Sequence, residues 1–355
     1  MITRLIAAAV AVLALLSTGA GWAHADVPTG SASPVAAPAG TYPVGRVDTE
    51  IDVQGRRLMV SVWYPALAAG APAPYVPVSD PAARLHVALR SADWMHTALA
   101  GPVMAAATAA ATEGAPIDTS NGPLPVLVLS PGLGTPRWNL SGLATAAASL
   151  GWVVVTVDHT GEAPSVQLGD GTVVDGDLPY LTDDLMGARL AQRITDVRLV
   201  LDRLSTLPVV GGHLDLERVA MGGHSYGGTT AIQTAAADPR VRAVVLIDSP
   251  AGWQGVVGAP TLTVPVLDLR LTVPWADGWP QAIGADRVTL AHAAHYSATD
   301  LCSFGADAIE CGTVDVDTAT HVTRTVITRW LDRQLRDGAA PRFEAPQLTW
   351  SLDQH

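Results

Sequence analysis

The chain has 355 residues, of which 48% are hydrophobic and 15% are charged. Acidic residues outnumber basic ones by 33 to 21, so the formal net charge of −12 disfavours a nucleic-acid partner. A chain of this length and apolar content can bury a large core, and we expect one large domain with an insertion.

The N-terminal segment has the features of a secretory signal peptide. Arg4 supplies the positive charge, residues 5–16 form an apolar run, and Ala23-His24-Ala25 places small residues at a cleavage site. The apolar run is too short to span a bilayer comfortably, and no nearby cysteine can carry a lipid. We therefore expect residues 1–25 to be removed and the mature protein to be extracellular. Residues 26–41, rich in Pro, Ala, Ser and Gly, are predicted to form a flexible leader.

Eight short apolar runs are predicted to be strands. Residues 46–53 and 58–64 flank Gln54-Gly55 and indicate an antiparallel hairpin. The other six runs resemble buried parallel strands and cover residues 124–129, 152–157, 219–222, 241–247, 264–269 and 287–290. Helical segments lie between most of them, and an amphipathic helix is predicted over residues 320–336. The alternation predicts an α/β fold: a mostly parallel, eight-stranded sheet with an N-terminal antiparallel hairpin and helices on both faces.

Residues 77–121 interrupt this alternation as an alanine-rich insertion that we expect to be helical. Met95, Leu99, Val103 and Met104 could form a mobile apolar lid over a lipid-like substrate. Static packing of the same helices on the core explains these residues as well, and we favour it. The domain is placed at residues 42–338, with 339–355 as a C-terminal tail.

The only two cysteines, Cys302 and Cys311, are nine residues apart. In an exported protein such a pair can oxidise and close a short loop, whereas two unpaired buried thiols are the alternative. We predict a disulfide.

The motif Gly223-His224-Ser225-Tyr226-Gly227 lies between a predicted strand and a predicted helix. A serine that attacks a carbonyl must be lifted out of the backbone at a sharp turn, and flanking glycines make that turn possible. The motif therefore indicates a nucleophile elbow, although a glycine-rich turn with a helix-capping serine has the same pattern.

A nucleophilic serine needs a base and an acid that orients the base, and in hydrolases of this architecture they follow the serine in the order acid, then histidine. Asp248 directly follows strand 241–247, and His295 lies just beyond strand 287–290. We favour these two residues. The competing acids Asp268 and Asp277, and the competing bases His292 and His159, remain open at this point.

Two backbone amides are expected to bind the oxyanion. One belongs to Tyr226, after the serine, and the other to Leu133 in the loop Ser130-Pro131-Gly132-Leu133-Gly134. Tryptophans on loops near the same sheet edge either line an apolar substrate pocket or are structural; they are Trp138, Trp253, Trp275 and Trp279.

Taken together, these motifs resemble the plasma-type platelet-activating factor acetylhydrolases, a branch of the α/β hydrolases with related secreted bacterial esterases and lipases. The resemblance covers roughly residues 42–301 and rests on five features: Val62-Trp63-Tyr64-Pro65, the segment 129–134, the strand end at 154–159, the elbow 223–228, and Asp248 with His295 followed by Asp300. It implies a catalytic triad of Ser225, Asp248 and His295, with Leu133 and Tyr226 as oxyanion donors. The chain departs from the family at Pro131, where a histidine is common, and at Thr160-Gly161-Glu162.

The sequence therefore predicts a secreted serine hydrolase that cleaves lipid-like or short-chain carboxylic esters through an acyl-enzyme on Ser225, with no metal or organic cofactor. A small-molecule or lipid ester is the expected partner, with transient contact to a lipid surface. The alternatives are a cutinase-like polyesterase, an acyltransferase or exopeptidase using the same triad, and a hydrolase fold retained as a non-enzymatic lipid-binding protein.

Overall fold

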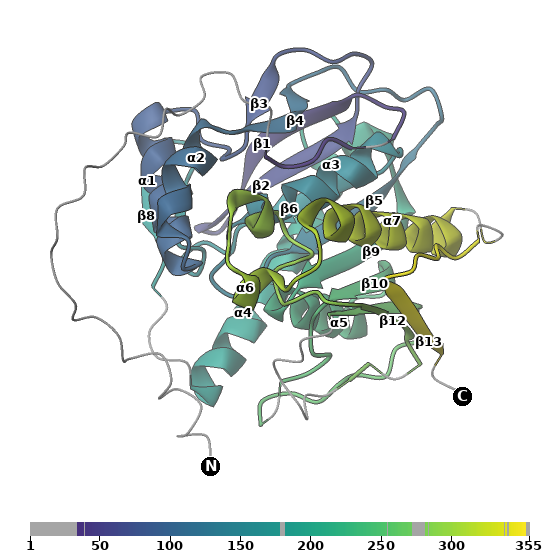
Figure 1. Ribbon diagram of the computed structural model, residues 1–355. Helices are drawn as coiled ribbons and strands as arrows, with labels where there is room; N and C mark the ends of the chain where they lie inside the picture. The colour runs from purple at the N-terminus through teal and green to yellow at the C-terminus, as the bar shows by residue number, and fades with distance from the viewer. Residues whose placement is uncertain are drawn as a thin grey trace, which may run out of the picture. The chain divides into compact units, whose positions relative to one another are not determined.

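The computed structural model of the protein describes residues 34–38, 40–177, 182–253, 255–271, 281–282, 284–336, 338 and 341–352. The predicted signal peptide and most of the predicted leader lie outside the described residues, as do Asp277, Trp275 and Trp279. In the described part of the chain, one eleven-stranded sheet has the order β13-β12-β11-β10-β9-β5-β6-β2-β1-β4-β3 (Figure 1).

Six neighbouring strands form the parallel centre of the sheet. They are β5 (Leu124–Ser130), β6 (Val153–Val157), β9 (Leu214–His224), β10 (Val241–Ile247), β11 (Val266–Leu271) and β12 (Asp286–Leu290). Every residue of β5 and β6 is buried, as is expected for strands that are covered on both faces. The predicted parallel strands are confirmed, and their carboxyl ends meet at one edge of the sheet.

The predicted antiparallel hairpin is also confirmed. Strands β1 (Val44–Val53) and β2 (Arg56–Pro65) pair along their whole length, and β2 joins the sheet by pairing antiparallel with β6. Gln54 and Gly55 both have positive φ, at 53° and 84°, as a tight two-residue hairpin turn requires.

Helices cover both faces of the sheet (Figure 1). Helices α3 (Ser141–Ser149) and α7 (Val316–Leu335) pack with Leu127 and Leu129 on one face, and α4 (Asp183–Arg203) and α5 (Tyr226–Ala237) pack with Val126 and Val128 on the other. Successive strand side chains point to opposite faces, so one apolar run such as β5 feeds both cores. None of the described helices has the length and apolar character needed to cross a membrane.

Three strands extend the sheet beyond the eight that the sequence predicts. Strands β3 (Pro72–Pro74) and β4 (Thr108–Glu113) lie at one edge, and β13 (Leu348–Leu352) pairs antiparallel with β12 at the other. Part of the predicted C-terminal tail is therefore a strand of the domain. In β4 only Ala109 and Ala111 are buried, in the alternation expected of a strand. Because these buried side chains are alanines, the composition of the segment predicts a helix.

The expectation of an entirely helical insertion is thus wrong for β4, although the preceding part is helical. It contains α1 (Pro81–Trp94), η2 (Ala98–Ala100) and α2 (Gly101–Ala106). Met95 and Met104 are buried in a cluster with Tyr75 and Trp138, whereas the Leu99 side chain is 95% exposed. The remaining short elements are β7 (Ser165–Gln167), β8 (Val173–Asp175), η3 (Arg137–Leu140), η4 (Leu204–Thr206), η5 (Gly211–His213), η6 (Asp300–Phe304) and α6 (Ala308–Cys311).

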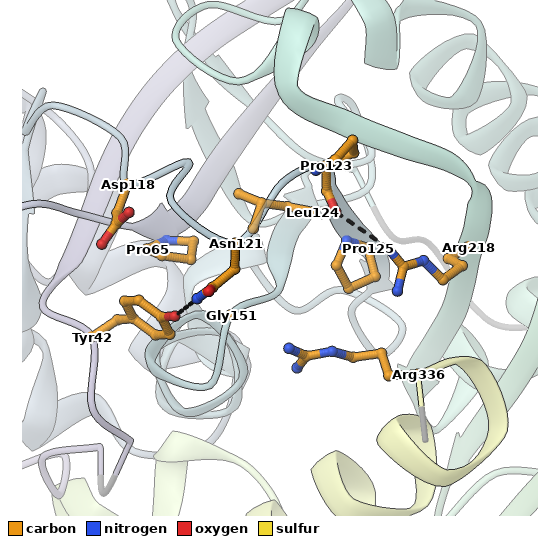
Figure 2. A pocket seen from close by; sticks show the side chains of 10 residues that line it. All are labelled: Tyr42, Pro65, Asp118, Asn121, Pro123, Leu124, Pro125, Gly151, Arg218 and Arg336. Atoms are coloured by element: carbon orange, nitrogen blue, oxygen red, sulfur yellow. Dashed lines mark hydrogen bonds between the residues drawn. The ribbon is translucent and has the colours of Figure 1, made fainter. Parts of the chain in front are cut away.

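A small hollow of about 50 Å³ lies at the amino-terminal edge of the parallel strands. Figure 2 shows Tyr42, Asn121, Arg218 and Arg336 around it, with Leu124 at the start of β5. None of the predicted catalytic or oxyanion residues lines this hollow, because their positions lie at or beyond the opposite ends of the strands.

The predicted disulfide is confirmed: Cys302 in η6 is bonded to Cys311 in α6. Closing a loop of this length removes conformational freedom from the unfolded chain, which is worth about 2 kcal/mol in loop-closure terms.

We expect the double variant Cys302→Ser, Cys311→Ser to unfold at a lower temperature than the wild type. A loss of about 2 kcal/mol corresponds to roughly 3 °C for a domain of this size. Differential scanning calorimetry under oxidising conditions measures the shift, and the wild type in the presence of a reductant should approach the variant. An unchanged melting temperature in both samples would contradict the stabilising role of the bond.

Candidate active site

Ser225 lies at the turn between β9 and α5 in a conformation that non-glycine residues rarely adopt. Its φ and ψ are 54° and −128°, and its backbone N–H donates to the Ile247 carbonyl at 2.9 Å. A Cβ atom on Gly223 would lie 2.3 Å from the Gly227 carbonyl carbon, and one on Gly227 would lie 2.0 Å from the Ser130 carbonyl oxygen. These glycines therefore permit the close backbone approach that holds the serine in its strained turn.

Asp248 directly follows β10 and is held by two interactions with β11. Its backbone N–H donates to the Leu269 carbonyl at 2.7 Å, and its Oδ1 accepts from the Leu271 N–H at 3.1 Å. The other carboxylate oxygen, Oδ2, lies 2.7 Å from Nδ1 of His295. The carboxylate is thus oriented towards an imidazole that is 47 positions further along the chain.

His295 lies in the loop after β12, and residues near the disulfide fix that loop. The Ala294 N–H donates to Ser297 Oγ at 2.9 Å, and Ser297 in turn donates to the Cys311 carbonyl at 2.7 Å. The Tyr296 N–H donates to the Glu310 carbonyl at 2.9 Å. With Nδ1 donating to Asp248, the imidazole carries its lone pair on Nε2, which is the arrangement a general base requires.

His224, the residue before Ser225, connects the elbow to the His295 loop. Its Nε2 donates to the His295 carbonyl at 2.7 Å, and the two imidazole rings pack with their centroids 4.4 Å apart. Burial is the main reason that the pKa of His224 is held well below its ordinary value, and the neighbouring His295 adds to the effect. His224 is therefore neutral, and its contacts with His295 connect the residue before Ser225 to the His295 loop.

The two amides expected to bind an oxyanion lie on segments that meet beside Ser225. A Cβ atom on Gly132, the residue before Leu133, would lie 3.6 Å from the Ser225 Cβ atom. Leu133 and Tyr226 belong to one apolar cluster with Met186. Among the described residues, neither the Leu133 N–H nor the Tyr226 N–H donates to a protein acceptor, so both are available to a ligand.

Three of the four competing candidates have other surroundings in the structure. Asp268 is fully buried within β11 and pairs with Arg270 and Arg287 at 2.9 and 3.0 Å. His159 is buried, and burial together with the Arg193 charge lowers its pKa. His292 is exposed and reaches solvent, with its own backbone carbonyl accepting from Thr313 and Val314, while Asp277 lies outside the described residues.

Of the four tryptophans considered for the pocket, the structure describes Trp138 and Trp253, and these two have different surroundings. Trp253 is partly buried and packs edge-on against the Tyr226 ring at 5.2 Å, beside the elbow. Trp138 is only 1% exposed and packs edge-on against Tyr75 beneath the insertion. Of the two roles that the sequence leaves open for Trp138, this burial in the cluster of the insertion favours the structural one.

No group of three or more His, Cys, Asp or Glu side chains in the described ranges is arranged to hold a metal ion.

A parallel sheet with a serine elbow between strand and helix, an acid after the next strand and a histidine after a later one defines an α/β hydrolase. The family model of platelet-activating factor acetylhydrolase, isoform II, matches residues 29–168 and 191–255, which is more than half of the chain. The chain belongs to this family, and the resemblance predicted from its motifs is confirmed. The matched residues include Ser225 and Asp248 and end before His295.

Individual relatives agree with this assignment. A protein named "Probable 1-alkyl-2-acetylglycerophosphocholine esterase" from Arthroderma benhamiae is 28% identical over 127 residues, covering 35% of this chain and 31% of that protein. The platelet-activating factor acetylhydrolase of Cavia porcellus is 29% identical over 160 residues, covering 38% and 36%. The chain thus matches about a third of the length of these curated relatives.

A solved structure matches over nearly the whole fold. The ferulic acid esterase from Streptomyces cinnamoneus is 30% identical, with a TM-score of 0.71, and the match covers 89% of this chain and 98% of that one. The α/β-hydrolase fold predicted from the sequence is confirmed by this neighbour.

We expect Gly227→Ala to destabilise the elbow strongly, because its methyl group would collide with the backbone carbonyls of Ser130 and Pro131. Overpacking against rigid backbone costs about 3 kcal/mol, or roughly 5 °C in melting temperature for a domain of this size. Gly212→Ala is the matched control, since a Cβ atom there meets nothing within 4 Å. Thermal unfolding of both variants provides the comparison, and equal melting temperatures would contradict the close approach described here.

Proposed function

We propose that the protein is a secreted serine hydrolase that cleaves carboxylic esters through an acyl-enzyme on Ser225. The observation that carries the proposal is the hydrogen bond between Asp248 and His295, together with the strained serine at the elbow that His224 links to the His295 loop. No other described Ser, His and Asp combine an oriented imidazole with a serine at a nucleophile turn.

The proposed reaction begins when Ser225 Oγ attacks the ester carbonyl carbon and His295 Nε2 accepts the hydroxyl proton. Asp248 holds the imidazole by Nδ1 and stabilises its positive charge. The carbonyl oxygen becomes an oxyanion and accepts hydrogen bonds from the N–H groups of Leu133 and Tyr226. The C–O bond to the leaving alcohol then breaks, and the alcohol departs with the proton from His295.

Water completes the cycle by the same steps. His295 removes a proton from the attacking water, the acyl carbon passes through a second tetrahedral species, and Ser225 leaves with the proton that His295 returns. The acid product carries the oxygen atom of water, so ester plus water gives acid plus alcohol with no other reactant.

The substrate class is supported by what the relatives are called. The first two relatives are named for removal of an acetyl group and the third for esters of ferulic acid, so all three names describe hydrolysis of an acyl group. We therefore propose lipid-like or short-chain acyl esters for this chain. A cutinase-like polyesterase and an acyltransferase or exopeptidase remain the alternatives that use the same residues.

Secretion is part of the proposal and is supported by the N-terminal charge, apolar run and small-residue site, and by the disulfide. The exported form is expected to begin after Ala25.

Ser225→Ala should abolish turnover of a nitrophenyl ester, with kcat falling by about 10⁴-fold or more, because no other group replaces the nucleophile. An active-serine fluorophosphonate probe should label the wild type and fail to label the variant. Circular dichroism checks that the variant is folded, and labelling that persists in folded Ser225→Ala would overturn the assignment.

Asp248→Asn should lower kcat by about 10⁴-fold, because an amide in place of the carboxylate favours the wrong imidazole tautomer. Asp268→Asn is the comparison variant, because the Asp268 carboxylate of the wild type pairs with two arginines within the sheet. Near-normal turnover of Asp248→Asn, with a large loss of turnover in Asp277→Asn, would identify Asp277 as the triad acid in place of Asp248.

A series of nitrophenyl esters of rising acyl length measures the substrate preference directly. We expect kcat/KM to pass through a maximum within one range of acyl length. Addition of a primary alcohol distinguishes hydrolysis from acyl transfer, because a transferase would give a new ester as the main product.

A further inference from the structure

A second chain of serine, histidine and aspartate lies beneath the proposed active site. Ser130 Oγ lies 2.9 Å from His159 Nε2, and His159 Nδ1 lies 2.9 Å from Asp196 Oδ2. All three side chains are buried, so an ester cannot reach Ser130. Its hydroxyl also accepts a hydrogen bond from Arg193 at 3.3 Å, which joins this chain to a buried ion pair.

Arg193 on α4 is 1% exposed and directs its guanidinium at the oxyanion loop. One terminal nitrogen donates to the Pro131 carbonyl at 2.7 Å, and the other donates to the Gly132 carbonyl at 2.9 Å. The same guanidinium lies 5.1 Å from the centroid of the Tyr226 ring. One side chain therefore contacts the two segments that carry the proposed oxyanion donors.

Glu162 completes the arrangement from the loop after β6. Its two carboxylate oxygens lie 3.0 and 2.9 Å from Arg193 Nε, and Oε1 accepts from the Gly134 N–H at 3.2 Å. Burial alone would raise the pKa of Glu162, but the charge and hydrogen bonds of Arg193 hold it below its ordinary value. The pair is therefore ionised, and it holds the backbone on both sides of Leu133.

Because a peptide bond is planar, the direction of the Gly132 carbonyl determines the direction of the Leu133 N–H. The structure has no cis peptide bond among its described residues, so the Gly132 carbonyl and the Leu133 N–H point in opposite directions from the same plane. The Gly132 carbonyl accepts from Arg193, and also from the N–H and Oγ1 of Thr135 at 3.1 and 3.0 Å, so the Leu133 N–H is directed away from these donors. Rotation of this plane would withdraw the amide and present a carbonyl oxygen in its place.

We propose that Arg193 and Glu162 are positioning residues for the oxyanion hole, which together fix the Gly132–Leu133 peptide plane so that the Leu133 N–H faces the reacting carbonyl. This inference rests on the proposed ester hydrolysis at Ser225. It gives Glu162, in the segment where the sequence departs from its family's pattern, a role that no sequence motif assigns.

The alternative is that the pair only stabilises the fold. A buried arginine elsewhere in the molecule provides a matched control: Arg46 on β1 is also 1% exposed, pairs with Asp48 at 3.0 Å, donates to the Pro74 carbonyl and lies 5.3 Å from the Trp63 ring centroid. Arg193→Met removes the arginine that pairs with the buried Glu162. Arg46→Met removes an equally buried arginine from the partly exposed Asp48, which also lies 3.5 Å from Arg137. Of the two arginines, only Arg193 lies against the oxyanion loop.

The experiment compares these variants by nitrophenyl acetate kinetics and by inhibition with phenylboronic acid. As boron accepts an electron pair from Ser225 Oγ, the hydroxyl proton passes to His295 Nε2, and the resulting tetrahedral boronate anion has an oxygen in the oxyanion position. We expect Arg193→Met to lower kcat by about 10–100-fold, because a misdirected donor costs nearly as much as a lost one. The inhibition constant should rise by a similar factor, while KM changes by no more than about threefold.

Arg46→Met should lower the melting temperature while keeping kcat and the inhibition constant within about twofold of the wild type at a temperature where it is folded. If Arg193→Met does not fold, Arg193→Lys replaces it, since an ammonium group reaches one carbonyl but cannot bind both as the guanidinium fork does. For Arg193→Lys we expect about a tenfold loss in kcat with a matching rise in the inhibition constant.

Two failures are distinguishable. A wild type that neither hydrolyses the ester nor binds phenylboronic acid overturns the proposed function and this inference with it. A wild type that does both, with a folded Arg193 variant that keeps its kcat and boronate affinity, overturns the inference alone. Equal losses in the Arg193 and Arg46 variants would also overturn it, because they would indicate a general effect of destabilisation.

Discussion

The contact of the elbow with the end of β5 is the constraint on which the rest of the site depends. Gly227 leaves room for only a hydrogen atom between α5 and the carbonyls of Ser130 and Pro131. This spacing brings the first turn of α5 against the oxyanion loop, and it forces Ser225 into a backbone conformation that costs free energy. The hydrogen-bonded parallel strands on either side supply the stability that maintains this conformation.

Buried polar and charged groups under the carboxyl edge reinforce the same arrangement. Arg193 with Glu162, and His159 with Asp196, lie directly behind the oxyanion loop, and Arg56 adds a bidentate contact to Asp196. Such groups are costly to bury, and loss of one partner typically destabilises a protein by about 3–5 kcal/mol. Arg193 donates hydrogen bonds to the Pro131 and Gly132 carbonyls, which an apolar side chain could not do.

The strands and the elbow could be predicted because their signals are local. Residues 241–247 form one apolar run that ends at Asp248, and the glycines around Ser225 mark the turn within five residues. The topology then brings Asp248 and His295 together without further information, since successive parallel strands end at one edge. The disulfide followed from two cysteines with no other partners in the sequence.

Other features depend on tertiary contacts that leave no local pattern. Strand β4 consists of alanine and threonine followed by Glu113, and it becomes a strand because β1 and β3 pair with it. Strand β13 acquires its conformation by pairing with β12. Arg193 lies on a helix with many arginines, and nothing in its neighbourhood indicates that its guanidinium reaches the loop at 131–132. Trp138 follows the oxyanion loop closely, yet the η3 turn rotates it into the insertion.

The central claim is that an acyl group is transferred to Ser225 with the help of His295. Rapid mixing with nitrophenyl acetate, acid quench and peptide mass spectrometry tests it most directly. We expect an acetyl group on the peptide that contains Ser225, formed within the first turnover and absent in His295→Ala. Steady release of nitrophenol with no acetylated Ser225 at any time, or acetylation of a different serine, would contradict it.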